Sequence, residues 1–228
     1  MAEKHWSDMP TGTIAYCSRE DQIYPAFAAY LARLAQKHPL AKIVHIVSND
    51  IADARNQAVL QCEGDWVWFI DCDMAFSPDT LKRLLAHGVD VVQVLCLKRH
   101  PPHEPIIWED GPERQNVAPR GRPRLIEVQS LGAGGTLYRK SCFTAMPGPW
   151  FEGILGREDT CFAAKLKAAG FTLYTDMGTP VGHTTPIVVW PEHDPVTGAW
   201  GVRYDAMNGQ SVTMMQESPI VRPELALR

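Results

Sequence analysis

The sequence predicts an α/β protein with an open, mostly parallel sheet that carries helices on both faces. Within the first hundred residues, short β-prone runs alternate with helical patterns, an order typical of a parallel sheet. The second observation is the apolar run at 67–70, which holds only β-branched and aromatic residues and stops at acids. Such a run predicts a strand that is buried on both faces.

The first half of the chain supplies four expected strands and three expected helices. Pro25 begins the first helix and His38-Pro39 ends it, and Ser77-Pro78 begins the third, with the proline at its first helical position. We expect strands at 13–17, 43–47, 67–70 and 89–97, and helices at 26–37, 51–62 and from 78 to His87-Gly88.

The second half is less regular. Residues 98–124 are rich in proline and arginine and predict a long loop. Strands are then expected at 125–129, 136–139 and 171–174, with a helix at 160–169 closed by Gly170. The tail from residue 186 onward has no clear period.

Composition narrows the class of protein. The net charge of −4 gives no global attraction to nucleic acid, and no run of about 18 apolar residues predicts a membrane span. The six cysteines are scattered without a Cys-x-x-Cys pair, and the N-terminus does not resemble a signal peptide, so we expect reduced thiols in a cytoplasmic protein. Neither a G-x-G-x-x-G fingerprint nor a P-loop is present.

Two acids, Asp71 and Asp73, stand one residue apart where the buried strand ends. Ligands of open α/β sheets bind beyond the carboxyl ends of the strands, so this pair is a candidate for chemistry. The alternative is a turn or capping role, which aspartate also favours.

Four features follow one another along the chain: Arg55-Asn56 near a helix start, Asp71-Cys72-Asp73, Glu158-Asp159 at a helix start after a glycine stretch, and His183 after Val-Gly. In this order the sequence resembles the GT-A fold glycosyltransferases, particularly small family-2-like enzymes of phage and bacterial type. The resemblance spans about 13–184. It implies a nucleotide-sugar-binding half at 13–97 and an acceptor-side half with a small lobe at 98–185, before a tail at 186–228, all in a single domain.

The resemblance assigns the metal and the catalytic acids. Asp73 would ligate Mn²⁺ or Mg²⁺ together with His183, and Asp71 would face the ribose or sugar hydroxyls or ligate through water. Asp159, with Glu158 beside it, would take the proton of the acceptor hydroxyl in inverting members. The alternative for these two acids is a favourable interaction with the helix dipole.

Further residues are expected to bind the donor. Arg55 suits a diphosphate or a base, since guanidinium matches phosphate geometry, although a salt-bridged helix residue is an equal alternative. Polar groups at the ends of the first two strands suit the nucleoside, and two glycines would let the sugar lie against the backbone. These residues are Ser18, Asn49, Asp50, Gly134 and Gly135.

The acceptor is read from a basic cluster at 114–124, which includes Arg120, Arg122 and Arg124. The cluster suits a solvated loop or an anionic acceptor such as a modified DNA base. Trp150 could stack on a sugar or base, or pack in the core.

Several alternatives stay open. A UDP-sugar is favoured as donor by analogy only, and the motifs do not separate inverting from retaining transfer. A non-catalytic nucleotide-sugar-binding module is one rival. A nucleotidyltransferase is another, although such enzymes carry a glycine-rich loop after the first strand, where this chain has Ser18-Arg19-Glu20-Asp21-Gln22.

Overall fold

The computed structural model describes residues 11–19, 23–98, 104–108, 124–153, 157–185, 187–193, 196–197, 200–206 and 211–215. The chain divides into two compact units, one of residues 1–98 and 103–184, the other of residues 99–102 and 185–228. We describe each unit by itself. The first contains the central sheet and all the helices named below.

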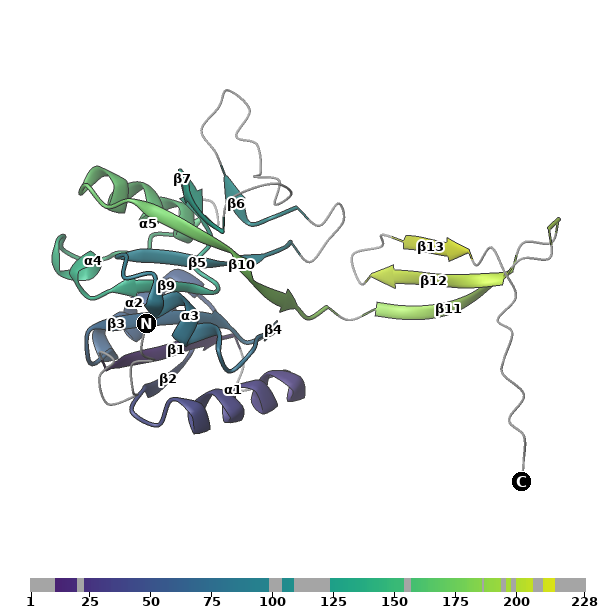
Figure 1. Ribbon diagram of the computed structural model, residues 1–228, viewed down its shortest axis with the longest axis horizontal. Coiled ribbons are helices and arrows are strands. Elements are labelled where there is room, and N and C mark those ends of the chain that lie inside the picture. Colours follow the sequence, from purple (N-terminus) through teal and green to yellow (C-terminus); the bar gives the residue numbers. More distant parts are fainter. Residues whose placement is uncertain are drawn as a thin grey trace. The chain divides into compact units, whose positions relative to one another are not determined.

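The central sheet has eight strands, and five of them run in one direction. β9, β7 and β4 run against them (Figure 1). The predicted mostly parallel α/β sheet is therefore confirmed. The strand order is β2 (Lys42–Val47), β1 (Gly12–Ser18), β3 (Trp66–Asp71), β9 (Thr136–Arg139), β5 (Val91–Cys96), β10 (Leu173–His183) and β4 (Met74–Ala75), with β7 (Leu125–Val128) paired to β10.

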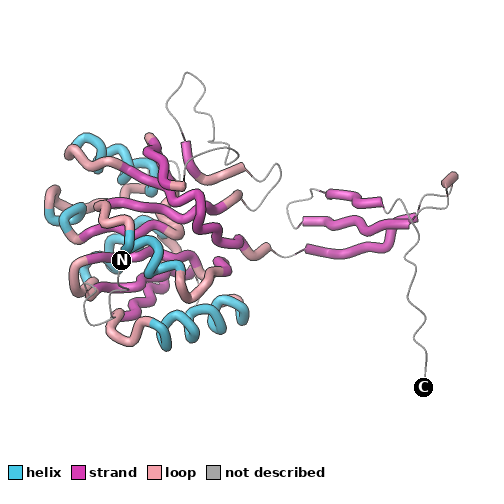
Figure 2. The backbone as a smooth tube through the Cα atoms, viewed as in Figure 1, coloured by secondary structure: helices cyan, strands magenta, loops and turns pink. Residues whose placement is uncertain are grey.

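Helices cover both faces of this sheet, as the tube view also shows (Figure 2). Along β3, Val67 and Phe69 pack into one core, whereas Trp66, Trp68 and Ile70 pack into the other. This period of two follows from strand geometry and confirms that β3 is buried on both sides. The first core contains residues of α2 (Ile51–Gln61), α4 (Ser141–Thr144) and α5 (Glu158–Ala168), and the second contains residues of α1 (Pro25–Lys37) and α3 (Thr80–Ala86).

The predicted elements of the first half lie within two residues of their expected bounds, but α3 does not begin with the residues expected. It begins at Thr80, with Asp79 as N-cap, so the expected proline at the first helical position is wrong. Ser77 and Pro78 instead precede the helix, and the Ser77 hydroxyl accepts a hydrogen bond from the Asp79 N–H. This local turn satisfies a backbone N–H that would have no partner within the helix.

β10 is longer than the strand expected at 171–174. It continues to His183 through a bulge, where Asp176 pairs with Val94 but Pro180 pairs with Leu95. The Gly-Thr-Pro sequence at 178–180, whose residues also favour turns, lies in this bulge. Asp176 is fully buried in it and accepts hydrogen bonds from the Thr179 hydroxyl and the Gly178 N–H, both at 2.8 Å.

Two small sheets complete the described structure. β6 (Ile107–Trp108) pairs with β8 (Ser130–Leu131) in the first unit. The tail, for which the sequence indicates no period, contains an antiparallel sheet of β11 (Ile187–His193), β12 (Trp200–Ala206) and β13 (Ser211–Met215). Across the described ranges, no helix has the length and apolar character needed to cross a membrane, and the six cysteines are free thiols.

Candidate active site

The two acids of the Asp-Cys-Asp sequence leave the sheet in different ways. Asp71 is the last residue of β3, Cys72 and Asp73 form a turn, and β4 begins at Met74. Asp73 is buried, whereas the side chain of Asp71 is 36% exposed. The turn thus points two neighbouring carboxylates into different surroundings.

Asp73 faces His183, as the resemblance predicts. Strand pairing brings them together, because His183 lies opposite Met74 and the Thr184 N–H donates to the Asp73 carbonyl at 2.7 Å. His183 Nε2 lies 3.3 Å from Asp73 Oδ1, and His183 Nδ1 lies 3.0 Å from the Leu97 carbonyl oxygen. Burial disfavours the charged imidazole, but the hydrogen bonds to Asp73, Cys96 and Leu97 raise the pKa of His183 to about 10. We call these two residues the carboxylate–histidine pair.

The pair has the donor set of a partial metal site. A histidine that ligates a metal usually donates its second ring N–H to a carbonyl or carboxylate, which is what Leu97 provides for Nδ1. Asp73 and His183 would leave further coordination positions for phosphate oxygens and water. Among the described residues, no three His, Cys, Asp or Glu side chains gather as a metal site, so Asp71 is not grouped with the pair.

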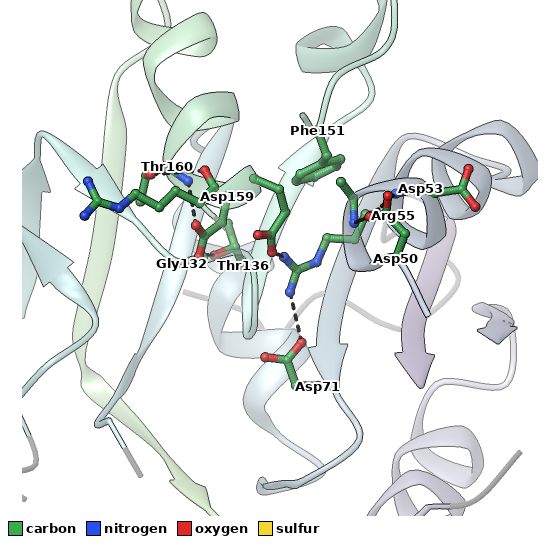
Figure 3. Close-up of polar contacts among 12 residues, drawn as sticks. Asp50, Asp53, Arg55, Asp71, Gly132, Thr136, Phe151, Asp159 and Thr160 are labelled. Atoms are coloured by element: carbon green, nitrogen blue, oxygen red, sulfur yellow. Dashed lines mark hydrogen bonds and ion pairs between the residues drawn. The ribbon is translucent and has the colours of Figure 1, made fainter. Parts of the chain in front are cut away.

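Asp71 instead contacts Arg55, which is buried in α2 (Figure 3). The Arg55 guanidinium lies 3.2 Å from Asp71 Oδ1 through Nη2 and donates to Glu158 through Nη1. Burial opposes the charge of Arg55, but Asp71 and Glu158 raise its pKa above the ordinary value. We call Arg55, Asp71 and Glu158 the carboxylate–arginine cluster. It joins the end of β3 to the first turn of α5.

Asp159 lies in the same first turn of α5. Its Oδ1 accepts the Thr160 N–H at 2.7 Å (Figure 3). Burial raises the pKa of the Asp159 carboxyl, while Arg55 and hydrogen bonds from the Thr160 and Ala133 backbone act in the opposite direction. A half-buried carboxylate with a raised pKa suits proton transfer better than an exposed aspartate does.

Contacts within the protein explain why glycine occupies two positions that are predicted to lie against the donor sugar. A Cβ at Gly134 would lie 2.1 Å from Asp71 Oδ2, and a Cβ at Gly135, where φ is +78°, would lie 2.3 Å from Val94 Cγ2. Gly134 therefore makes room for the Asp71 carboxylate, and Gly135 adopts a left-handed conformation over β5. Their predicted contact with a donor sugar stays a prediction.

Asn56 is a site residue to which the sequence assigns no role. Its Oδ1 accepts the N–H groups of Trp150 and Phe151 at 2.9 and 3.0 Å, and its Nδ2 donates to the Phe151 carbonyl at 2.8 Å. One amide of α2 thus holds the segment that precedes α5. The polar residue beside Arg55 near a helix start was the available signal, but its partners lie 94 and 95 residues away.

The other residues predicted to bind the sugar donor either hydrogen-bond within the protein or are exposed. The Ser18 hydroxyl lies 2.8 Å from His45 Nε2, and Asp50 caps α2 by accepting the Ala52 and Asp53 N–H groups. Asn49 is exposed. Their contacts with a nucleoside are untested.

Two of the predicted acceptor residues have partners within the protein. Trp150 donates its indole N–H to the Phe143 carbonyl at 2.9 Å and packs edge-on against the Phe143 ring, so core packing accounts for it. Arg124 Nε lies 3.4 Å from Asp176 Oδ1, at the bulge of β10. Arg120 and Arg122 lie outside the described residues.

Comparisons with known proteins agree with this geometry. The model of glycosyl transferase family 2 matches residues 24–142, which is more than half of the chain, so the chain belongs to this family. A comparison of the sequence with curated proteins gives no match.

Among solved structures, the fold is similar to A197 from STIV, with a TM-score of 0.51 and 14% identity over 94% of this chain and 97% of that chain. It is also similar to residues 1–349 of TarS from S. aureus, with a TM-score of 0.51 and 17% identity over 78% of this chain and 61% of that one. At these identities the two structures support the fold alone.

The chain is therefore a glycosyltransferase of the family-2 GT-A type, with a nucleotide sugar as its donor. The family assignment favours this over a nucleotidyltransferase and over a non-catalytic module.

Proposed function

We propose that the enzyme is metal-dependent and transfers a sugar from a UDP-sugar to the hydroxyl group of an anionic acceptor. Family membership supports the nucleotide-sugar donor. The metal, the nucleobase and the nature of the acceptor are the content of the proposal.

The observation that carries the metal is the carboxylate–histidine pair. An aspartate oxygen and an imidazole nitrogen 3.3 Å apart, with the second ring nitrogen on a carbonyl, form a donor set that Mn²⁺ accepts and Mg²⁺ tolerates less well. When bound by Asp73 and His183, a divalent cation would stabilise negative charge on the diphosphate as a Lewis acid.

The residues of this chain have separate roles in the transfer. Asp71 orients the ribose or sugar hydroxyls of the donor. Asp159 accepts the proton of the acceptor hydroxyl, whose oxygen forms a bond to the anomeric carbon. The bond between that carbon and the diphosphate oxygen breaks, and its electron pair leaves with the nucleoside diphosphate. Direct displacement of this kind inverts the anomeric configuration.

Basic residues support an anionic acceptor. The side chain of Arg124 is 61% exposed, and the sequence places Arg120 and Arg122 close to it in the chain. A hydroxylated DNA base is the acceptor we favour, because arginine side chains bind the phosphate backbone. Affinity for duplex DNA should then fall steeply as salt is raised, and binding that ignores salt would remove DNA from the proposal.

The deciding experiment is turnover of a panel of nucleotide sugars with Mn²⁺ or Mg²⁺, with wild type compared with Asp73→Ala and His183→Ala. We expect UDP-sugars to be turned over, chelation to stop the reaction, and Asp73→Ala to lower the rate by about a thousandfold, as loss of an electrostatic stabiliser does. Asp65→Ala serves as the control, because Asp65 is an exposed acid just before β3. Unchanged turnover in Asp73→Ala would refute the metal site.

A further inference from the structure

Arg55 is a cation enclosed between the two halves of the site. The residue is 5% exposed, and its guanidinium reaches Asp71 at the end of β3 and Glu158 in the first turn of α5. The aromatic ring of Phe151 lies 5.9 Å from the guanidinium carbon. Figure 3 shows the side chain extending from α2 toward Asp71 beneath this ring.

The position of Arg55 matters because of the charged groups around Asp159. Glu158 precedes it in α5, and the charge of Asp71 at the end of β3 acts on it. Tyr138 of β9 is also within electrostatic range, but burial raises the pKa of its phenol, so it stays neutral. The charged neighbours are therefore two acids and one cation, Arg55 from α2. A carboxylate buried among other acids favours its protonated form unless a cation offsets them.

We propose that Arg55 is a positioning residue that aligns Asp71 with the first turn of α5 and whose charge keeps Asp159 in the ionised form that can accept a proton. The inference rests on the proposed function, in which Asp159 is the base. It extends that function by assigning the control of the base to a residue of the donor half.

The direction of the electrostatic effect can be worked out. Burial raises the pKa of Asp159 and Arg55 opposes the rise, so loss of the Arg55 charge raises that pKa further. The base would then be protonated over a wider range of acidic pH, and the acid limb of the rate profile would move to higher pH. Loss of the Glu158 charge should lower the pKa of Asp159. It removes a neighbouring negative charge, and the charge of Arg55 then acts on Asp71 and Asp159 alone.

The test is the pH profile of kcat/KM for transfer in Arg55→Met, Arg55→Lys and Glu158→Gln. Arg33→Met is the matched control, because Arg33 is an exposed arginine of α1. For Arg55→Met we expect the acid limb at higher pH. The loss of kcat/KM at about pH 6 should exceed the loss at about pH 8 by about tenfold, which is the size of effect that an opposite charge at short range has on a pKa. For Glu158→Gln we expect the acid limb at lower pH.

Arg55→Lys separates charge from geometry. It should keep the acid limb near that of wild type but lower kcat, because an ammonium group does not reproduce the two-pronged contact with both carboxylates. A purely structural role would lower the unfolding temperature of the variants without moving their acid limbs in opposite directions.

The inference fails if the limbs of Arg55→Met and Glu158→Gln stay in place or move together. If Arg55→Met does not fold, Glu158→Gln decides alone, and an unmoved limb overturns the inference. Failure of the proposed function looks different, because full activity in Asp159→Asn would exclude this base whatever the Arg55 variants do.

Discussion

The carboxylate–arginine cluster and the carboxylate–histidine pair begin one residue apart, at Asp71 and Asp73, yet they are built in opposite ways. In the cluster a buried cation already satisfies two acids, and breaking such a buried pair costs about 3–5 kcal/mol. In the pair a single acid meets an imidazole whose second nitrogen is held by the backbone. The cluster is suited to hold Asp71 and the first turn of α5 in place, and the pair is suited to bind a metal ion.

The difference teaches that the spacing of an acidic motif does not fix what each acid does. Asp71 and Asp73 are chemically identical, and their partners come from α2 and from β10. The roles are set by those partners, which lie far away in the sequence.

The strongest test of the difference between the two regions is Asp159→Asn. Asp159 lies next to Glu158 of the carboxylate–arginine cluster. We expect transfer to fall by about a hundredfold to ten thousandfold, since the amide cannot accept the proton. Donor affinity measured by calorimetry should stay unchanged, because the carboxylate–histidine pair is untouched. The control is Asp65→Asn, and weakened donor binding in Asp159→Asn would contradict the separation of the two regions.

Gly134→Ala tests whether the position of Asp71 depends on the glycine stretch. The new methyl group would lie 2.1 Å from Asp71 Oδ2, so the carboxylate must move away from its place beside Arg55. We expect donor binding to weaken by about tenfold, or about 1.4 kcal/mol. Gly153→Ala is the control, because the nearest atom to its new Cβ would be at 3.8 Å. Equal donor affinity in both variants would refute the role given to Gly134.

Asn56→Ala tests how much the cluster side depends on the link between α2 and residues 150–151. It leaves two N–H groups and one carbonyl without their amide partner, so we expect the free energy of unfolding to fall by about 2–3 kcal/mol. Chemical denaturation measures this. Gln57→Ala, the next residue and exposed, should change stability far less. Equal losses would show that Asn56 has no special role.

The smallest expected effect is that of Trp150→Phe. It removes the indole N–H that bonds the Phe143 carbonyl, at a cost of about 1 kcal/mol of stability. The KM for the acceptor should not change if the ring belongs to the core. A large rise in that KM would restore the predicted stacking role.

Local pattern was enough to predict much of the fold. The run 67–70 is apolar on both sides and short, and a strand between two helical layers is the arrangement that buries both faces. The boundaries of α1, α2 and α5 also follow from local signals. At the start of α3 the Ser77 hydroxyl takes part in a turn instead, and the sequence does not indicate the short helix α4.

The site is harder to predict from the sequence than the fold, because its contacts join distant segments. Arg55 and Glu158 are 103 residues apart, and no local rule indicates that a guanidinium in α2 reaches the first turn of α5. The placement of His183 beside Asp73 came from family resemblance, whereas its physical cause is the pairing of β10 with β4. The bulge of β10 has no distinct local signal either, because bulges and turns use the same residues, such as the glycine and proline at 178 and 180.

The bulge of β10 bears on which insertions and deletions this fold can tolerate. Four steps along β10, from Asp176 to Pro180, match one step along β5, from Val94 to Leu95. Deleting one residue from 177–179 either shortens the bulge or slips the pairing of 180–183 by one residue. Such a slip would turn His183 to the opposite face of the sheet and away from Asp73. We therefore expect this segment to tolerate insertions and deletions less well than a surface loop does, so that its residue count matters to the site as well as its side chains.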